Sequence, residues 1–226
     1  MQTEQHPHIK SFARREGRVT PGQQVALETL WDQYVLDPNK PLSLENSFEK
    51  IAPLTVEIGF GDGESLAQMA QASPGRNFIG IEVHKPGVGH LMLKLKEHDI
   101  RNVRIYCGDA IEIVDRLIPD QSVDTIQLFF ADPWPKKRHH KRRIVRNSFI
   151  DLIVKKLKKD GKFHAATDWE DYAEQMMEVL TSDNRIENCA GKGNFIERPE
   201  SRPVTKFERR GIRLGHSIHD LQFRRV

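Results

Sequence analysis

The segment from residue 54 to residue 72 most constrains the fold of this 226-residue chain. Residues 54–58 form a short apolar run, which is typical of a strand buried in a parallel sheet. Three alternate glycines follow, Gly59, Gly61 and Gly63, and residues 64–72 have a helical pattern. A strand, a glycine-rich turn and a helix in this order predict the first unit of an α/β fold, whose turn lets the backbone approach a ligand closely.

Strands and helices continue to alternate along the chain. The expected strands are 54–58, 78–83, 103–107, 123–130, 161–166 and 218–225, and the last of them is expected to close the sheet. The expected helices are 24–36, 64–72, 84–98, 110–117, 147–157 and 169–180. Elements of this length in this order predict a three-layer α/β sandwich around a mostly parallel sheet.

The composition indicates one globular domain. Residues 1–22 are polar and basic and predict a flexible N-terminal arm, which leaves 23–226 as the domain proper. The chain has no apolar run near the roughly 20 residues that span a bilayer and no signal-peptide pattern. Its two cysteines, Cys107 and Cys189, form no CxxC pair. We therefore expect a soluble cytoplasmic protein without a metal site.

Acidic residues lie at the ends of three expected strands. Glu57 lies in the first strand, Glu82 follows Gly59 by roughly twenty residues, and Asp109 follows the third strand. Such acids would repel a pyrophosphate but attract the sulfonium and ammonium groups of S-adenosylmethionine. They favour a cationic cofactor, although a structural role for Glu57 and a helix N-cap at Asp109 are open alternatives.

A basic run follows the expected strand 123–130. Asp132 comes directly after that strand, and Pro133 and Pro135 hold it and Trp134 out of helical conformation. Residues 136–143 (KKRHHKRR) then carry six Lys or Arg, two His and no acid. Such a run is often only a solvated face, but its position beside an acid at the sheet edge favours polyanion binding.

A second basic, proline-marked stretch covers residues 198–211 and predicts a loop. Glu208 lies in it among Lys206, Arg209 and Arg210, so its carboxylate could read a base edge while its neighbours contact phosphates. A solvated linker is the alternative. Thr167 and Asp168 follow the expected strand 161–166 and are expected at the same edge of the sheet.

Together these motifs resemble those of bacterial tRNA (guanine-N7)-methyltransferases, which are class I S-adenosylmethionine-dependent enzymes. The similar segments are SFARREGRVTPGQ, VEIGFGDG, IGIEVHKPGVG, GDA, FADPWPKKRHHKRR, ATDWEDYAEQM and RPVTKFERRG. The most specific are DPWPKKRH and TKFERRG in this order. The resemblance covers most of the chain and implies a Rossmann-like fold with a seven-stranded sheet.

The resemblance also implies the residues of the site. The cofactor contacts would be Glu57, Gly59, Gly61, Gly63, Glu82, Asp109 and Asp132, with Asp132 also the active-site acid. The substrate contacts would be Lys136, Asp168, Thr205, Lys206, Phe207 and Glu208. The RNA-interaction region would be Arg138, His139, His140, Lys141, Arg142 and Arg143.

The implied reaction transfers a methyl group from S-adenosylmethionine to N7 of a guanine in tRNA, at position 46 of the variable loop. Guanine N7 has an in-plane lone pair and no proton, so the transfer needs no general base. The implied enzyme uses no metal and is a monomer or a dimer. Alternatives are methylation of another nucleic-acid nitrogen, an RNA-binding protein without catalysis, and an NAD oxidoreductase, which the glycine spacing disfavours.

Overall fold

The computed structural model describes residues 11, 12 and 17–226, so most of the expected N-terminal arm lies outside the described residues. The strands are β1 Leu54–Ile58, β2 Asn77–Glu82, β3 Val103–Cys107, β4 Val123–Phe129, β5 Leu157–Thr167, β6 Ile186–Asn188 and β7 His219–Arg225. The helices are α1 Pro21–Thr29, α2 Trp31–Tyr34, α3 Leu44–Ser47, α4 Glu64–Ala72, α5 Lys85–Glu97, α6 Ala110–Leu117, the 3-10 helix η1 Lys137–Arg142, α7 Asn147–Lys156, α8 Glu170–Thr181 and α9 Lys206–Arg213.

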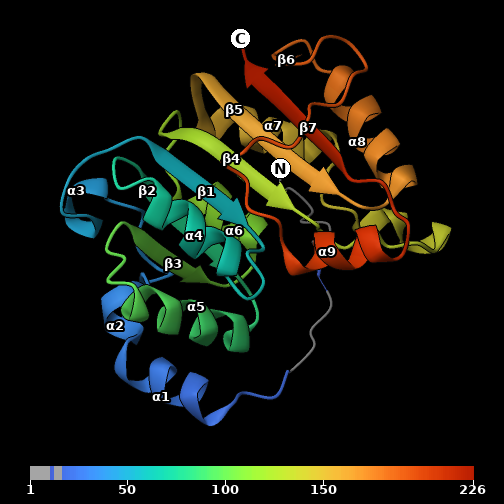
Figure 1. The fold of residues 1–226 in the computed structure, drawn as a ribbon. Helices are drawn as coiled ribbons and strands as arrows, with labels where there is room; N and C mark the ends of the chain where they lie inside the picture. The colour runs from blue at the N-terminus through green and yellow to red at the C-terminus, as the bar shows by residue number, and fades with distance from the viewer. Residues whose placement is uncertain (1–10, 13–16) are drawn as a thin grey trace, which may run out of the picture.

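One seven-stranded sheet in the order β3-β2-β1-β4-β5-β7-β6 forms the middle layer (Figure 1). Its strands are parallel except β7, which runs antiparallel to both β5 and β6. Helices α1, α4 and α5 pack on one face, and α6, α7 and α8 pack on the other. Every residue of β1 and β2 is buried, as expected for strands that helices cover on both sides. The predicted three-layer sandwich is confirmed.

Several predicted elements have the bounds that the sequence indicates. The strands at 54–58 and 103–107 and the helices at 64–72 and 110–117 match β1, β3, α4 and α6 residue for residue. The expected helix 24–36 is divided into α1 and α2 at Leu30. Thr20 begins α1 with a capping box, in which its side chain and that of Gln23 each accept the other's backbone N–H.

The prediction of a loop over residues 198–211 is wrong, because its second half is helix α9. The side chain of Thr205 caps this helix by accepting the N–H of Glu208 at 3.1 Å. The pattern Thr-x-x-Glu, a known helix-start signature, was the available signal. The C-terminal strand also does not lie at the edge of the sheet: β7 lies between β5 and the unpredicted strand β6.

Candidate functional site

The glycine turn between β1 and α4 is built on left-handed backbone. Gly59, Gly61 and Gly63 have φ angles of 71°, 64° and 76°, which non-glycine residues rarely adopt. A Cβ on Gly63 would lie 2.6 Å from the Cβ of Leu91, so this glycine allows α4 to pack on α5. A Cβ on Gly59 would meet nothing within 4 Å, so this glycine faces open space.

Glu82, at the end of β2, holds the glycine turn in place. Its Oε2 accepts the N–H of Gly61 at 2.9 Å. Its Oε1 accepts the backbone N–H groups of Val83 and His84 at 2.7 and 3.0 Å, and it lies 2.9 Å from the His84 ring Nδ1. Glu82 therefore orders the backbone that follows β1 and the backbone that follows β2. It is buried but lines a cavity, so a ligand in that cavity can contact it.

Two cavities lie at the carboxyl ends of the parallel strands. The first, of about 220 Å³, has both apolar and polar walls: Ser11, Phe12, Ile58, Gly59, Ile81, Glu82, Val83, His84, Gly108, Ala110, Leu128, Phe130, Ala131, Asp132, Ile144 and Phe207. The second, of about 430 Å³, is more polar: Glu57, Gly59, Phe60, Gly61, Asp62, Glu64, Ser65, Gln68, His90, Phe129, Phe130, Val204, Thr205, Lys206, Phe207 and Arg209. Because Gly59, Phe130 and Phe207 line both, the two cavities lie next to each other and share a wall.

Glu57 lines the second cavity. Its side chain is 3% exposed, and its Oε2 has no hydrogen-bond partner among the described residues. Burial, with the nearby charges of Glu82 and Asp62, raises the pKa of Glu57 to about 8. A buried carboxyl without a partner, facing a cavity, indicates a site for a hydrogen-bond donor or a cation.

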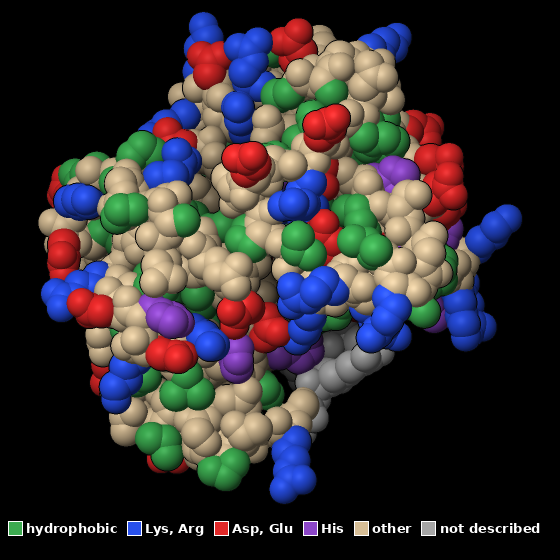
Figure 2. Space-filling view, viewed as in Figure 1, with side chains coloured by type: hydrophobic (Ala, Val, Ile, Leu, Met, Phe, Trp, Pro, Cys, Tyr) green, Lys and Arg blue, Asp and Glu red, His purple; other side chains and the backbone are tan. Residues whose placement is uncertain are grey.

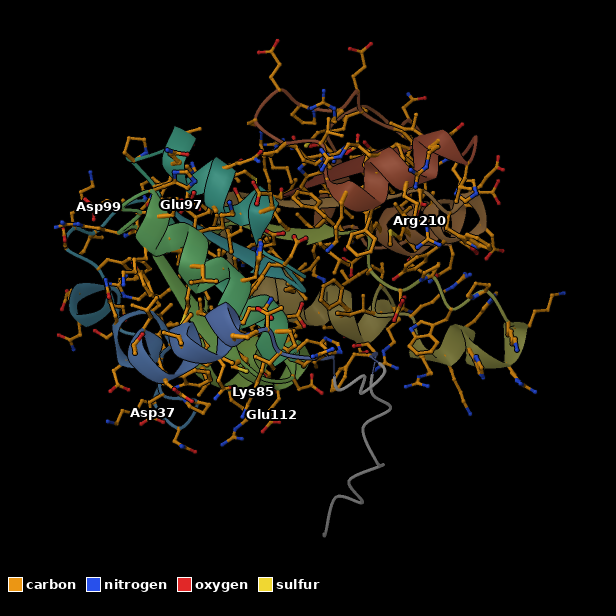
Figure 3. The ribbon with its side chains drawn as sticks, turned by 60° about the horizontal axis from the view of Figure 1, so that its bottom comes forward. Asp37, Lys85, Glu97, Asp99, Glu112 and Arg210 are labelled. Carbon is orange, nitrogen blue, oxygen red and sulfur yellow. The ribbon has the colours of Figure 1, made fainter. Side chains whose placement is uncertain are left out.

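Helix α9 forms the other wall of the second cavity. Lys206 Nζ lies 2.5 Å from Asp62 Oδ2, so the start of α9 is bound to the glycine turn. Burial opposes ionisation of Asp62, but Lys206 outweighs it and lowers the pKa of the carboxyl. Figure 2 shows Lys and Arg side chains over α9 beside Asp and Glu side chains, and Figure 3 shows Arg210 on this helix.

Asp132 is exposed, follows β4 and lines the first cavity. The residues around it have unusual backbone: Phe130 and Trp134 have φ angles of 53° and 46°. Such positive φ values in bulky residues are strained and are found most often at functional sites. No hydrogen bond or ion pair involves the Asp132 carboxylate within residues 11, 12 and 17–226, so the side chain is available to a ligand.

Two residues of the N-terminal arm contact the basic run and the first cavity. Trp134 Nε1 donates to the carbonyl of Ser11 at 3.1 Å, and an Arg142 NH2 group donates to the carbonyl of Phe12 at 2.9 Å. The Arg142 guanidinium also lies over the Trp134 ring, 3.9 Å from its centroid. Sequence reasoning did not predict that Ser11 and Phe12 line a cavity.

The basic run divides into exposed and buried residues. Lys136, Lys137, Arg138 and Lys141 are exposed, and His139, His140 and Arg142 are partly buried. Burial, followed by the surrounding cations, lowers the pKa of His139. Arg143 is buried: it donates to the carbonyl of Pro133 at 2.8 Å and pairs with Asp171. A polyanion can therefore reach most of the run but not Arg143.

Gly63 and four other residues predicted to bind the cofactor or the substrate do not line the two cavities. Asp109 caps α6, since its Oδ1 accepts the Ile111 N–H at 3.0 Å. This helix N-cap is the alternative to cofactor binding that the sequence indicates. Lys136 lies on the exposed run. Asp168 lies against α9, where a Cβ on Gly211 would come within 2.8 Å of its Oδ2. Glu208 points away from the cavity into a buried ion pair with Arg202.

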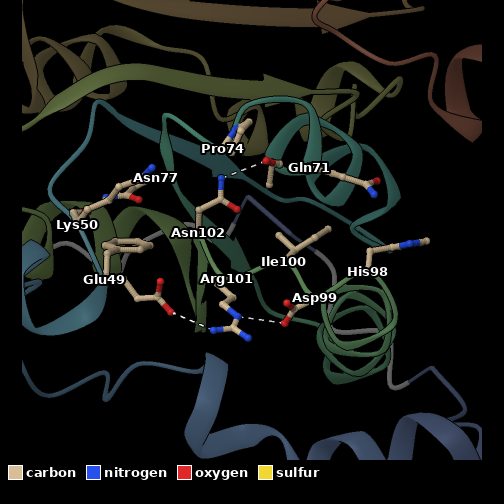
Figure 4. A pocket seen from close by; sticks show the side chains of 12 residues that line it. Glu49, Lys50, Gln71, Pro74, Asn77, His98, Asp99, Ile100, Arg101 and Asn102 are labelled. Atoms are coloured by element: carbon tan, nitrogen blue, oxygen red, sulfur yellow. Dashed lines mark hydrogen bonds and ion pairs between the residues drawn. The ribbon is translucent and has the colours of Figure 1, made fainter.

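Another cavity, of about 300 Å³, lies at the opposite end of the sheet, beside the starts of β2 and β3. Its polar groups bind one another: Arg101 contacts Asp99 at 3.0 Å and Glu49 at 3.6 Å (Figure 4). The described residues contain no group of three or more His, Cys, Asp or Glu that could hold a metal ion. None of the described helices is long and apolar enough to cross a membrane.

Comparisons with known proteins concern the family and the fold of the chain. A family described as a putative methyltransferase matches residues 51–221. The tRNA (guanine-N(7)-)-methyltransferase of Halorhodospira halophila is 50% identical over 217 residues, which cover 95% of this chain and 94% of that protein. The protein of the same name from Aeromonas hydrophila is 52% identical over 219 residues, covering 96% of this chain and 92% of that one. The fold is similar to that of the aminoglycoside resistance methyltransferase NpmB1, with a TM-score of 0.53 at 14% identity over 84% of this chain and 94% of that one.

Proposed function

Because the chain belongs to the family of tRNA (guanine-N7)-methyltransferases, we propose that it transfers the methyl group of S-adenosylmethionine to N7 of a guanine in tRNA. The observation that carries the proposal is the pair of adjacent cavities at the carboxyl ends of the strands. Clefts at this edge are where open α/β sheets bind their ligands. The proposed target is guanine 46 of the variable loop, as the family resemblance implies.

The residues present fit S-adenosylmethionine. Glu82 lines the first cavity, and its Oε2, which accepts one N–H, can also accept from a ribose hydroxyl, while Gly59 leaves open space where a side chain would obstruct a ligand. Glu57 is protonated in the free protein, but its buried Oε2 has no hydrogen-bond partner among the described residues, and a cationic group bound beside it would favour the ionised carboxylate. In this assignment Gly61 and Gly63 shape the turn, and Asp109 acts by capping α6 beside the cavity. When bound, the cofactor supplies an electrophilic methyl group.

The protein's own contribution is positioning and electrostatic stabilisation. N7 has a free lone pair, so no side chain needs to remove a proton before the transfer. Methylation leaves a cationic purine, and the exposed Asp132 carboxylate at the rim can stabilise that charge. Phe207, 47% exposed and shared by both cavities, offers an aromatic face on which a base can stack. Orientation of the base toward the methyl group then accounts for much of the rate enhancement.

The basic run supplies the surface for the tRNA backbone. Lys136, Lys137, Arg138 and Lys141 are exposed beside Asp132, so phosphates bound there bring a neighbouring nucleotide to the rim. His139, His140 and Arg142 stand next to them and complete the contact region. Arg143 supports the run from inside by its bonds to Pro133 and Asp171.

The remaining assignments are also proposals. Residues 1–22 would act as a basic arm and 23–226 as the methyltransferase domain. The protein would act in the cytoplasm without a metal, as a monomer or a dimer. Methylation of another nucleic-acid nitrogen is not favoured, since both relatives described above are named for guanine N7.

The test is methyl transfer from labelled S-adenosylmethionine to an unmodified tRNA transcript. We expect one labelled nucleotide per tRNA, in the variable loop, as N7-methylguanosine. A matched transcript with 7-deazaguanine at that position keeps the shape of the base but has carbon in place of N7, so it should accept no methyl group. Equal labelling of the two transcripts would overturn the assignment to N7.

A further inference from the structure

Four ionisable side chains from separate parts of the chain form a buried cluster behind α9. They are His164 on β5, Arg202 in the segment before α9, Glu208 on α9 and Asp220 on β7, and each is at most 4% exposed. We call this group the buried ionic cluster. It lies under the segment that forms one wall of the second cavity.

Arg202 is the centre of the buried ionic cluster. Its NH1 and NH2 donate to the Glu208 carboxylate at 2.6 and 3.2 Å. Its Nε and NH2 donate to the two Asp220 oxygens, both at 2.8 Å. His164 Nε2 lies 2.7 Å from Asp220 Oδ1. The guanidinium also lies over the rings of Phe129 and Phe130, 5.7 and 5.8 Å from their centroids.

This geometry joins α9 to the sheet. Asp220 belongs to β7, and Glu208 is in the first turn of α9, so one planar guanidinium links the two elements at fixed distance and orientation. Replacing a buried ion pair by apolar residues is often neutral or stabilising, so stability alone is a weak explanation for such a cluster. What the cluster defines is the position of α9.

The position of α9 sets one side of the candidate active site. Lys206, Phe207 and Arg209 surround Glu208 in sequence and line the second cavity, whereas Glu208 does not. Phe207 also lines the first cavity. A shift of Glu208 would therefore move the residues that meet the substrate.

We propose that Arg202 is a positioning residue for methyl transfer, and that Glu208 acts through Arg202 instead of accepting hydrogen bonds from guanine. The inference rests on the proposed function and adds to it a role for residues behind the cavity wall. It replaces the sequence-based expectation that Glu208 reads the base edge.

The first experiment replaces Arg202 by Lys, which keeps the positive charge but loses the planar fork that reaches both carboxylates. We expect single-turnover methyl transfer to fall ~100-fold, the loss that a displacement of about 1 Å at an active site can cause. The dissociation constants for tRNA and S-adenosylmethionine should change less than about threefold, because neither the basic run nor the first cavity includes Arg202. Arg185→Lys is the matched control, since Arg185 forms exposed ion pairs with Asp151 and Asp183.

The second experiment separates positioning from base recognition. Inosine lacks the exocyclic amino group of guanine, so a transcript with inosine at the target position removes one donor that Glu208 would accept. If Glu208 acts through Arg202, Glu208→Gln slows transfer to guanine and to inosine by the same factor. If Glu208 contacts the base, the mutation narrows the guanine-to-inosine preference of the parent enzyme, and the proposal is overturned.

The third experiment combines the two variants. Because Arg202 and Glu208 would act as one unit, the double variant should lose about as much activity as either single variant. Additive losses would contradict the proposal. Hydrogen exchange gives a readout that remains when an arginine variant folds poorly: in Glu208→Gln the amides of α9 should exchange faster while those of β1 are unchanged. Unchanged α9 exchange would also contradict it. Failure of the parent enzyme to methylate tRNA would overturn the proposed function instead.

Discussion

The Lys206 ammonium and the Asp62 carboxylate form an ion pair of 2.5 Å that spans the second cavity, from the first turn of α9 to the glycine turn after β1. The two side chains come from segments more than a hundred residues apart in the chain. Both are partly exposed, at 54% and 32%. The ion pair therefore connects the two walls of the candidate site.

The first prediction concerns this ion pair. Lys206→Met should change the free energy of unfolding by only about 0–1 kcal/mol, because partly exposed pairs contribute little to stability. Methyl transfer should fall about tenfold or more, since the cavity walls lose their link. Urea unfolding and single-turnover rates on the same variant check this. Lys155→Met, which removes surface pairs with Asp115 and Asp120, is the control.

The second prediction concerns the pH dependence that Glu57 produces in the protein without ligands. In the folded protein Glu57 keeps its proton up to about pH 8, whereas in the unfolded chain it loses the proton near 4.5. Between these values the unfolded state binds fewer protons, so the free energy of unfolding falls as the pH rises through this range and then levels off. Glu57→Gln should remove this slope and stabilise the protein by a few kcal/mol near pH 8, because one pKa unit corresponds to about 1.4 kcal/mol.

Urea unfolding at several pH values, with parent and variant side by side, measures the Glu57 contribution. Glu82 and Asp62 are the charged neighbours that raise its pKa, so the variant isolates one carboxyl of the group. Parallel curves for the two proteins would show that Glu57 ionises normally.

The third prediction concerns Glu82. Glu82→Ala should weaken S-adenosylmethionine binding by about 1.5–3 kcal/mol, the usual contribution of a hydrogen bond to a charged group. Part of this loss comes from the glycine turn, which becomes more mobile in the variant because Glu82 no longer accepts the Gly61 N–H. Titration calorimetry measures it, with the exposed Glu97→Ala as control. Unchanged affinity would leave Glu82 with the role of a turn support alone.

Much of the fold could be predicted because its signals are local. The first strand, its glycines and α4 follow from a buried apolar run that ends at residues with positive φ. Strand β6 has only three residues and no apolar run, so its pairing with β7 decides its structure. Helix α9 is mostly charged and is held in place by an ion pair between Glu208 and Arg202. A search for hydrophobic periodicity therefore does not find this helix.

The candidate site was predictable to a similar extent. Glu57, Glu82 and Asp132 line the cavities because parallel strands deliver their ends to one edge. In the sequence Arg143 does not differ from its neighbours in the basic run. Its burial could not be predicted, because it depends on tertiary contacts with Pro133 and Asp171. The contacts of Ser11 and Phe12 with Trp134 and Arg142 are equally long-range.

The fourth prediction concerns Asp132. Asp132→Ala should reduce turnover by about tenfold to a thousandfold, because the site loses a charge that stabilises the methylated, cationic base. The melting temperature should hardly change, since the side chain is exposed and makes no ion pair within the described residues. Single-turnover kinetics measures the loss of activity, and thermal unfolding measures the change in melting temperature. Parallel losses of activity and stability would identify a structural acid.

The last prediction contrasts two basic residues that are two positions apart. Lys141 is exposed, so Lys141→Gln should weaken tRNA binding and flatten its salt dependence by roughly 0.7–0.9 log unit for one lost phosphate contact. Arg143 is buried, so Arg143→Gln should leave that slope unchanged and instead destabilise the protein by about 1–3 kcal/mol, because the Pro133 carbonyl and Asp171 lose their donor. Filter binding over a range of salt concentrations, together with urea unfolding, separates the two effects. A flattened salt slope in Arg143→Gln at unchanged stability would mean that this guanidinium reaches the RNA.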